Sequence, residues 1–136
     1  MYDKNQESLD TYSSGWSRGD CSIILSGVED SYTFSGLPNM EPVDKMNFKM
    51  FWVNFRSNVE DGGGPKSVSS DFMKFKNVIR RQVAGILVVV SLYQTFFFQV
   101  GESVVETGQW IVPGFAEGVY MTEAKDGKIM WEEATM

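Results

Sequence analysis

The longest uncharged stretch of the chain lies between Arg81 and Glu102, where residues 82–101 read QVAGILVVVSLYQTFFFQVG. As a helix rising about 1.5 Å per residue, this run would be about 30 Å long, which is the thickness of the hydrocarbon core of a bilayer. Buried strands are usually only about 4–8 residues long and end at turn residues. Nothing between Ile86 and Val100 is Gly, Pro, Asn or Asp. The pattern therefore predicts a helix that crosses a membrane once.

The same helix is predicted to begin before the uncharged run. An apolar face precedes the run at i, i+3 and i+4 spacing, formed by Phe72, Phe75, Ile79 and Val83. A basic cluster lies opposite this face, and it consists of Lys74, Lys76, Arg80 and Arg81. Ser69, Ser70 or Asp71 can cap such a helix. We therefore expect one transmembrane helix over about residues 71–101.

A second interpretation of the run stays open, in which it forms core strands of a soluble, β-rich single domain. The β-branched residues Val88, Val89 and Val90 favour this interpretation, since such side chains are enriched in strands. Its weakness is the turn that a hairpin requires. The best break is Gln94-Thr95, which is weak turn chemistry.

Residues 44–59 predict an amphipathic helix, which Asp44 can cap and which Gly62 follows. On a helical projection an apolar face spans about 100°, formed by Phe48, Phe51, Trp52, Phe55 and Val59. Cationic residues form an adjacent strip, consisting of Lys45, Lys49 and Arg56. This arrangement is typical of a helix lying in the headgroup layer of a membrane. A strand is the alternative, because Met46, Phe48, Met50 and Trp52 also alternate.

The remaining segments complete a four-part organisation. Residues 1–61 comprise a polar arm over 1–20, a small β-hairpin from 22–26 and 31–35, and the interfacial helix. Residues 62–66 form a Gly/Pro linker, since three glycines followed by proline continue neither a helix nor a central strand. The spanning helix at 71–101 follows. Residues 102–136 form an acidic tail, in which Asp126-Gly127 predicts a second hairpin.

Charge asymmetry around the run predicts its orientation. Four basic residues precede it within ten positions, and no Lys or Arg follows it until Lys125. Positive charge remains on the side from which insertion starts, so the N-terminus is expected on the cytoplasmic, matrix or stromal side. The predicted membrane-interface residues are Phe48, Phe51, Trp52, Phe55, Arg80, Arg81 and Trp110.

Composition argues against several functions. The net charge of the 136-residue chain is −6, which disfavours nucleic-acid binding through a basic surface. The chain has no histidine and only one cysteine, Cys21, so Ser-His and Cys-His pairs and multi-cysteine metal sites are excluded. Carboxylate pairs such as Glu132-Glu133 lie beside turns or a terminus, where solvated charge explains them. We therefore predict no catalytic residues, no metal and no enzymatic activity.

Two polar residues inside the run predict a partner. Gln94 and Gln99 are costly against lipid unless they face protein, so we expect them to bind another subunit together with Phe96, Phe97 and Phe98. A glutamine oxygen can also ligate the magnesium of a tetrapyrrole, which makes the two glutamines candidates for pigment contact. No cofactor is otherwise predicted, and contact with lipid is expected.

The expected function is that of a non-catalytic, single-pass accessory subunit of a larger membrane complex, with respiratory and photosynthetic complexes as the first candidates. Its partners would be other membrane protein subunits and the lipid bilayer, and not nucleic acid. The alternative is a soluble, β-rich structural or assembly protein, such as a component of a viral particle. The two differ in whether residues 82–101 form a helix or strands.

Overall fold

The computed structural model describes residues 3–65 and 72–136, with the side chains of residues 84–87 and 97–101 left undescribed. Within this part, helices and strands follow the order α1 (Lys4–Arg18), α2 (Cys21–Leu25), β1 (Val28–Ser35), β2 (Val43–Asp44), α3 (Phe48–Asp61), β3 (Lys74–Val90), β4 (Thr95–Val112), β5 (Ala116–Lys125) and β6 (Lys128–Thr135). The strands form one sheet in the order β2-β1-β6-β5-β4-β3, in which only β1 and β6 pair in parallel.

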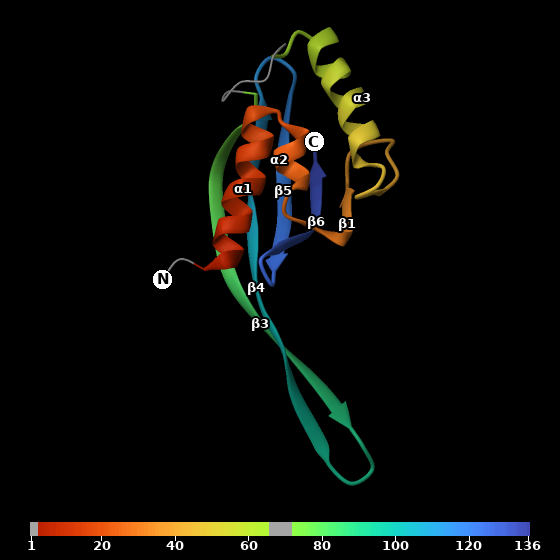
Figure 1. Ribbon diagram of the computed structural model, residues 1–136, viewed down its shortest axis with the longest axis vertical. Coiled ribbons are helices and arrows are strands. Elements are labelled where there is room, and N and C mark those ends of the chain that lie inside the picture. Colours follow the sequence, from red (N-terminus) through yellow and green to blue (C-terminus); the bar gives the residue numbers. More distant parts are fainter. Residues whose placement is uncertain (1–2, 66–71) are drawn as a thin grey trace.

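The helices lie against one face of this strongly bent sheet, and the hairpin of β3 and β4 projects far beyond them (Figure 1). The core fills the space between α1, α3 and the covered face. It is rich in aromatic side chains, including Tyr12, Trp16, Tyr32, Phe34, Phe48, Trp52, Phe72, Trp110 and Tyr120. The fold is therefore β-rich, and the prediction of a mainly α protein is wrong.

Helix α1 occupies the segment that was expected to be a polar arm. The Asp3 side chain caps its start by accepting from the Asn5 amide, and Gly19 ends it in the left-handed region at φ 67°. Leu9, Tyr12 and Trp16 recur at helical spacing and are all buried. The prediction of a polar arm is wrong because these three apolar residues are enough to dock a helix whose other faces are polar.

The predicted N-terminal hairpin is also wrong, since its first half is helix α2. The Asp20 carboxylate accepts from the amides of Ser22 and Ile23, which starts a helix where an apolar run predicted a strand. Only residues 28–35 form a strand, β1, and it pairs with β2 and β6.

Helix α3 has its aromatic face against protein. Phe48 and Trp52 are buried, and their rings lie edge-on to Trp16 with centroids 5.9 and 5.4 Å away. These contacts have the edge-to-face geometry that aromatic pairs prefer in protein interiors. The predicted position in a headgroup layer is therefore wrong, because the apolar face of the helix closes a protein core.

Within residues 82–101, residues 91–94 form a turn, while 82–90 and 95–101 form strands rather than a helix. They belong to β3 and β4, which pair from Lys74 with Ile111 to Val90 with Thr95. The turn between them is built by Ser91, whose hydroxyl accepts from the amides of Tyr93 and Gln94 and donates to the Gln94 carbonyl. The predicted transmembrane helix over 71–101 is wrong within the described residues of that range.

Among the described residues, no helix has the length and apolar character that a membrane crossing requires. The predicted single-pass topology, with its cytoplasmic N-terminus and its bilayer and membrane-subunit partners, loses its basis with that helix. The β-rich alternative is the one that the structure supports.

A two-residue turn joins β5 to β6. Asp126 and Gly127 both have positive φ, 53° and 77°, and Lys125 pairs with Lys128 across them. This is the geometry that Asp-Gly favours in hairpins, because glycine and aspartate tolerate the left-handed region. The turn places β6 between β5 and β1, at the centre of the covered face.

Candidate ligand-binding site

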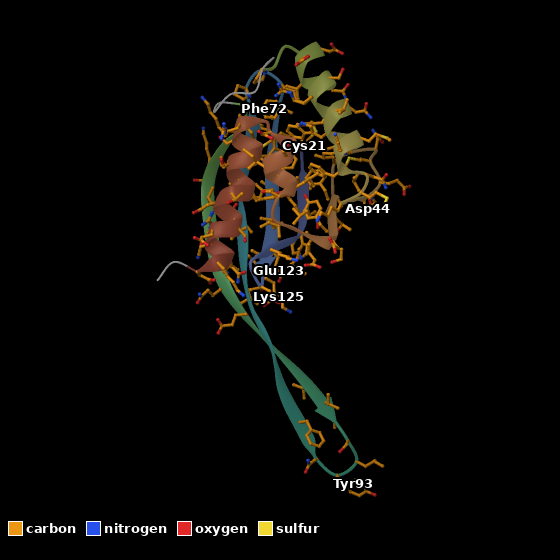
Figure 2. The ribbon with its side chains drawn as sticks, viewed as in Figure 1. Cys21, Asp44, Phe72, Tyr93, Glu123 and Lys125 are labelled. Carbon is orange, nitrogen blue, oxygen red and sulfur yellow. The ribbon has the colours of Figure 1, made fainter. Side chains whose placement is uncertain are left out.

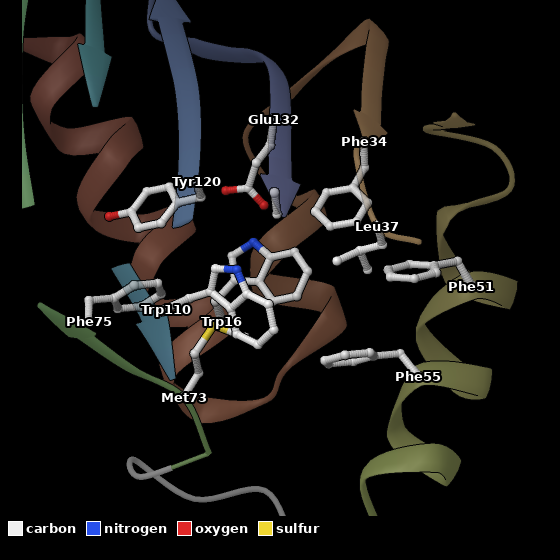
Figure 3. A pocket seen from close by; sticks show the side chains of 11 residues that line it. Trp16, Phe34, Leu37, Phe51, Phe55, Met73, Phe75, Trp110, Tyr120 and Glu132 are labelled. Carbon is white, nitrogen blue, oxygen red and sulfur yellow. The ribbon is translucent and has the colours of Figure 1, made fainter. Parts of the chain in front are cut away.

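An apolar pocket lies between the helices and the covered face of the sheet (Figure 3). Its walls come from α1, β1, α3, β3, β4, β5, β6 and the segments after β1 and before β3. The lining residues are Trp16, Phe34, Leu37, Phe51, Phe55, Met73, Phe75, Trp110, Tyr120, Glu132 and Ala134. The enclosed space is about 20 Å³, enough for one water molecule, so the aromatic side chains almost fill it.

A much larger groove adjoins this pocket. It has a volume of about 800 Å³ and shares Leu37, Phe51, Phe55 and Trp110 with the pocket. The rest of its lining comes largely from α3 and from the segment before it, including Met40, Pro42, Val43 and Met50. The four shared side chains therefore separate the inner pocket from an opening wide enough for a small molecule.

The pocket contains one carboxyl group, that of Glu132 on β6. A bulge at Met130 brings it there: Ala124 pairs with Ile129, while the preceding Glu123 pairs with Trp131, so one residue of β6 is extra. Without this extra residue, strict alternation from the buried Ile129 would turn Glu132 outward. With it, Glu132 is 7% exposed and its carboxyl points at the indole rings of the pocket (Figure 3).

Burial controls the protonation of Glu132. Loss of solvation raises the pKa of its carboxyl to about 8, the negative charge of Glu106 adds to the rise, and hydrogen bonding from Tyr12 opposes it. At neutral pH the group is therefore mostly protonated, and its O–H is a hydrogen-bond donor inside an apolar pocket.

Two tyrosines lie behind Glu132. The hydroxyls of Tyr12 and Tyr32 are 2.5 Å apart and both are buried. Burial raises the pKa of each phenol well above 10, so both stay neutral. The hydrogen bond between the two hydroxyls links α1 to β1 behind Glu132.

The indole of Trp16 presents a second donor. Its Nε1–H is buried and makes no hydrogen bond of normal geometry among the described residues, although it is close enough to the Tyr12 hydroxyl to lower the pKa of that phenol. The indole of Trp110, by contrast, donates to the Thr135 carbonyl over 3.1 Å. A buried donor without a partner costs about 1–3 kcal/mol, so a ligand whose acceptor atom pairs with the Trp16 Nε1–H would remove this cost.

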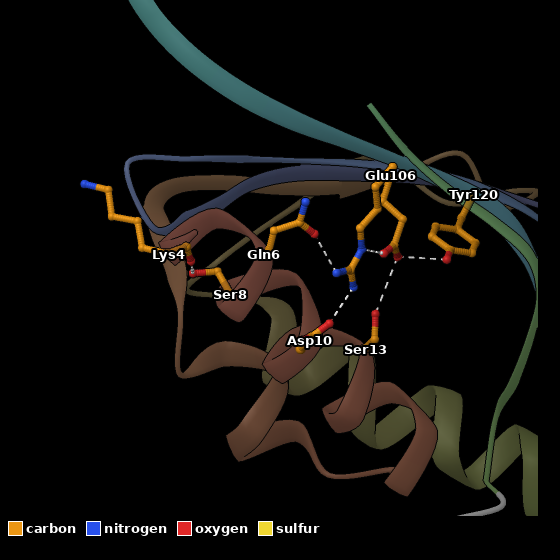
Figure 4. A network of polar contacts seen from close by, with 8 residues as sticks. Lys4, Gln6, Ser8, Asp10, Ser13, Glu106 and Tyr120 are labelled. Atoms are coloured by element: carbon orange, nitrogen blue, oxygen red, sulfur yellow. Dashed lines mark hydrogen bonds and ion pairs between the residues drawn. The ribbon is translucent and has the colours of Figure 1, made fainter. Parts of the chain in front are cut away.

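A polar network fixes one wall of the pocket (Figure 4). Arg80 donates from Nε to Glu106 over 2.7 Å, and its other nitrogens donate to Gln6 and Asp10 over 2.8 Å each. The Tyr120 hydroxyl, on the pocket wall, donates to Glu106 over 2.8 Å. Burial and the charge of Glu106 raise the pKa of Tyr120, which keeps this donor protonated. The network thus ties α1, β3, β4 and β5 together beside the pocket.

The residues predicted for a membrane interface have several different environments. Phe51, Phe55 and Trp110 line the pocket, whereas Phe48 and Trp52 are core residues. Arg80 lies in the polar network and Arg81 is exposed on β3. Their expected contact with lipid headgroups was inferred from the amphipathic pattern of residues 44–59 and from the predicted spanning helix, and it is wrong, because α3 packs on a protein core and residues 82–101 do not form that helix.

The residues predicted to bind a partner lie on the projecting hairpin. Gln94 is exposed at its turn and Phe96 is 41% exposed on β4. The side chains of Phe97, Phe98 and Gln99 lie outside the described part of the structure. Partner binding through these five residues, and pigment contact through the two glutamines, stay predictions.

Sequence reasoning missed the roles of Glu132 and Trp16 in the pocket and of Tyr12 behind it. The 3.6-residue spacing of Leu9, Tyr12 and Trp16 was a usable signal for a buried helix face. No comparable signal marks Glu132, because its inward orientation depends on the bulge. Among the described residues, no group of three or more His, Cys, Asp or Glu side chains is arranged to hold a metal ion.

Comparison with known proteins identifies the fold. No family model matches the sequence, and no curated protein matches it either. TerC, co-crystallised with polyporic acid, is similar in structure over 97% of this chain and 90% of its own, at 16% identity and a TM-score of 0.54. AusH from Aspergillus nidulans is similar in structure over 99% of this chain and 84% of its own, at 15% identity and a TM-score of 0.51. An NTF2-like protein from Cytophaga hutchinsonii is similar in structure over 99% of this chain and 98% of its own, at 12% identity and a TM-score of 0.51.

At these identities the similarity shows an NTF2-like fold and nothing finer. It extends over nearly the whole chain, so the prediction of a single-pass membrane subunit is wrong. The prediction that the chain is not an enzyme is not confirmed, because Glu132 in its pocket is a group that can transfer protons. The structural role in the β-rich alternative stays a prediction.

Proposed function

We propose that this chain binds a flat, largely apolar small molecule that carries a carbonyl oxygen, and that Glu132 transfers a proton to and from the carbon next to that carbonyl. The supporting observation is a single buried carboxyl with a pKa of about 8, set among aromatic walls. Strongly perturbed carboxyls in apolar pockets are frequent at sites of acid–base chemistry.

The walls and donors of the pocket define the ligand class. The rings of Trp16, Phe55 and Trp110 offer flat apolar surfaces, which favour a planar ring system. The Trp16 Nε1–H and the protonated Glu132 are both donors, so the polar atom of the ligand should be an acceptor oxygen. TerC, which shares the fold, was co-crystallised with polyporic acid, and this supports a small-molecule ligand.

Entry requires movement of side chains. The ligand would pass from the groove into the nearly filled inner pocket and displace Phe51 and Phe55, which separate the two spaces. Both side chains are only partly buried, so they can turn toward the groove without disrupting the core.

The proposed chemistry is reversible proton exchange, through an enolate, at the carbon next to the carbonyl. The ionised form of Glu132 takes a proton from the carbon beside the carbonyl, and the electron pair moves onto the carbonyl oxygen. The Trp16 Nε1–H stabilises the resulting oxyanion by a hydrogen bond that strengthens as charge develops. Glu132 then returns the proton to carbon. A pKa of about 8 suits both halves of this cycle near neutral pH.

The test uses 1-tetralone, a flat bicyclic ketone, as the probe. We expect it to quench tryptophan fluorescence on binding and to exchange its α-hydrogens for deuterium in D₂O, as NMR would show. The exchange should stop in Glu132→Gln while binding weakens by less than about tenfold, because the amide can donate but cannot accept the carbon-bound proton. Glu133→Gln, on the neighbouring residue, is the matched control and should exchange normally.

Two further results distinguish the roles of the donors. Trp16→Phe should weaken binding of 1-tetralone by about tenfold more than binding of tetralin, which lacks the carbonyl, because the substitution removes one hydrogen bond to the ketone in addition to the wall area that both compounds lose. The exchange rate of the unaltered protein should rise with pH and level off above pH 8, as the carboxylate form accumulates. Exchange that survives in Glu132→Gln would rule out Glu132 as the base.

A further inference from the structure

The groove beside the pocket is much the larger of the two spaces. Its volume is about 800 Å³, against about 20 Å³ for the pocket. A volume of about 300–1,000 Å³ is typical of small-molecule sites, whereas the pocket by itself holds about one water. When Phe51 and Phe55 turn aside, the space that they release can hold a ring. The groove is then the space available to whatever is attached to that ring.

The apolar surface of the groove differs from that of the pocket. Aromatic rings form most of the pocket wall, but the apolar side chains that belong to the groove alone are mostly aliphatic: Pro38, Met40, Pro42, Val43, Met50 and Met136. The three methionines come from the segment before β2, from α3 and from the residue after β6. Methionine side chains are flexible and adapt to what they contact. Such a surface suits a flexible aliphatic chain better than a rigid planar ring.

The polar residues of the groove lie at its rim. All six in the described lining are exposed, whereas most of the apolar lining residues are buried or partly buried against the core. The six are Thr33, Glu41, Asp44, Asn47, Asn54 and Asn58. An apolar floor with a polar, solvated rim is the ordinary anatomy of a site that binds an apolar group.

The charges at this rim are all negative. Glu41 and Asp44 contribute carboxylates, and no Lys or Arg belongs to the described lining. Asp44 accepts hydrogen bonds from the backbone and side-chain nitrogens of Asn47 over 2.9 Å each, and Figure 2 shows it close to the start of α3. An anionic group in the groove would therefore meet charges of its own sign without a cation to offset them.

We infer that the groove binds an uncharged aliphatic chain carried by the ring that enters the pocket, an inference that rests on the ligand proposed for Glu132. Leu37, Phe51, Phe55 and Trp110 line both spaces, so a ring and its chain would contact one continuous apolar surface. Figure 3 shows Phe51 and Phe55 projecting from α3 toward the indole rings of the pocket. The ligand class is thus a planar ketone with an aliphatic tail rather than a bare ring.

Two ketones that differ only in the chain test the groove. 6-Butyl-1-tetralone carries four carbons on the ring position farthest from the carbonyl. A fully buried methylene is worth about fourfold in affinity, so a butyl chain that is half buried should tighten binding about 15-fold over 1-tetralone, measured by tryptophan fluorescence. 6-Butyltetralin should gain as much over tetralin, because the groove does not contact the carbonyl. A carboxylate in place of the terminal methyl group should remove most of the gain.

Substitutions of exposed methionines show whether the gain comes from the groove. Met50 and Met136 are 70% and 64% exposed, so Met50→Asp with Met136→Asp makes the groove polar without altering the core. This double variant should bind 1-tetralone normally and should reduce the gain to less than about threefold. Met46→Asp with Val53→Asp is the matched control, because both residues are exposed and line neither space. Circular dichroism spectra equal to that of the unaltered chain show that both variants have folded.

The outcomes separate this inference from the proton transfer proposed for Glu132. Equal affinities for the two ketones, with α-hydrogen exchange intact, would overturn the chain site and leave the proposed chemistry standing. A gain that persists in the groove variant would place the chain elsewhere and overturn it too. So would a dimer that dissociates in that variant, seen by sedimentation equilibrium, because a second copy would then fill the groove. A chain gain without any exchange would support the groove and count against Glu132 as the base.

Discussion

Replacing Arg80 with leucine is expected to lower the free energy of unfolding by about 3–5 kcal/mol, because it leaves a buried carboxylate without its cation. Glu106 is only 1% exposed, and its Oε1 lies 2.7 Å from the Arg80 Nε. Arg80 also bridges to Asp10 on α1 over 2.8 Å, so the substitution removes a link between α1 and the sheet as well. Urea denaturation followed by circular dichroism measures the loss.

Two controls separate the buried charge from a general effect. Arg81→Leu changes the neighbouring, exposed arginine and should cost less than about 0.5 kcal/mol. The double variant Arg80→Leu with Glu106→Leu removes both charges and should recover most of the loss, because no unpaired carboxylate remains. Equal losses in Arg80→Leu and Arg81→Leu would contradict the expectation and assign the network little energetic weight.

Sequence reasoning succeeded where one local rule decides the structure. The Asp126-Gly127 turn follows from the backbone freedom of the two residues, and these two residues do join β5 to β6. The spacing of Phe48, Trp52 and Phe55 places their side chains together on α3. Periodicity alone, however, does not indicate what the apolar face contacts. The assignment of lipid rather than a protein core depended on the adjacent cations Lys45, Lys49 and Arg56, which are equally compatible with a helix whose polar side faces water.

The uncharged run led to a wrong prediction because its length fits both a transmembrane helix and a long β-hairpin. A twenty-residue helix spans a bilayer, but β3 and β4, at 17 and 18 residues, form a hairpin that is unusually long. The turn that would have revealed the hairpin contains no glycine, proline, asparagine or aspartate. It depends on the Ser91 hydroxyl, which satisfies two amides of the turn. Serine alone is a weak signal for a turn, so Ser91 did not indicate a hairpin in the sequence.

The candidate site was not predictable by the same means. Glu132 and Glu133 are consecutive carboxylates near the end of the chain, and solvent exposure is the ordinary explanation for such a pair. One points into the pocket only because the bulge at Met130 shifts the alternation of β6 by one residue. That shift is a property of how β6 pairs with β5. The sequence of β6 taken alone therefore does not indicate the bulge.

Raising the pH from 5 to 9 is expected to lower the free energy of unfolding of the unaltered chain by roughly 4 kcal/mol more than that of Glu132→Gln. The pKa of Glu132 is about 8 in the folded chain, against an ordinary value of 4.5. Between these two values the folded state keeps a proton that the unfolded state has released. Stability therefore falls as the pH rises through this window, and the decrease is complete above pH 8.

The measurement is a series of urea denaturation curves at pH 5, 7 and 9 for the unaltered chain, Glu132→Gln and Glu133→Gln. Tyr12 and Tyr32 do not interfere, because burial raises their pKa values above 10 and thus beyond this window. Glu133→Gln should keep the pH dependence and Glu132→Gln should lose it. Parallel curves for all three proteins would mean that Glu132 ionises normally in the folded state. The proton transfer proposed for the pocket would then lose its physical basis, because a carboxyl with an ordinary pKa is a much weaker base toward carbon near neutral pH.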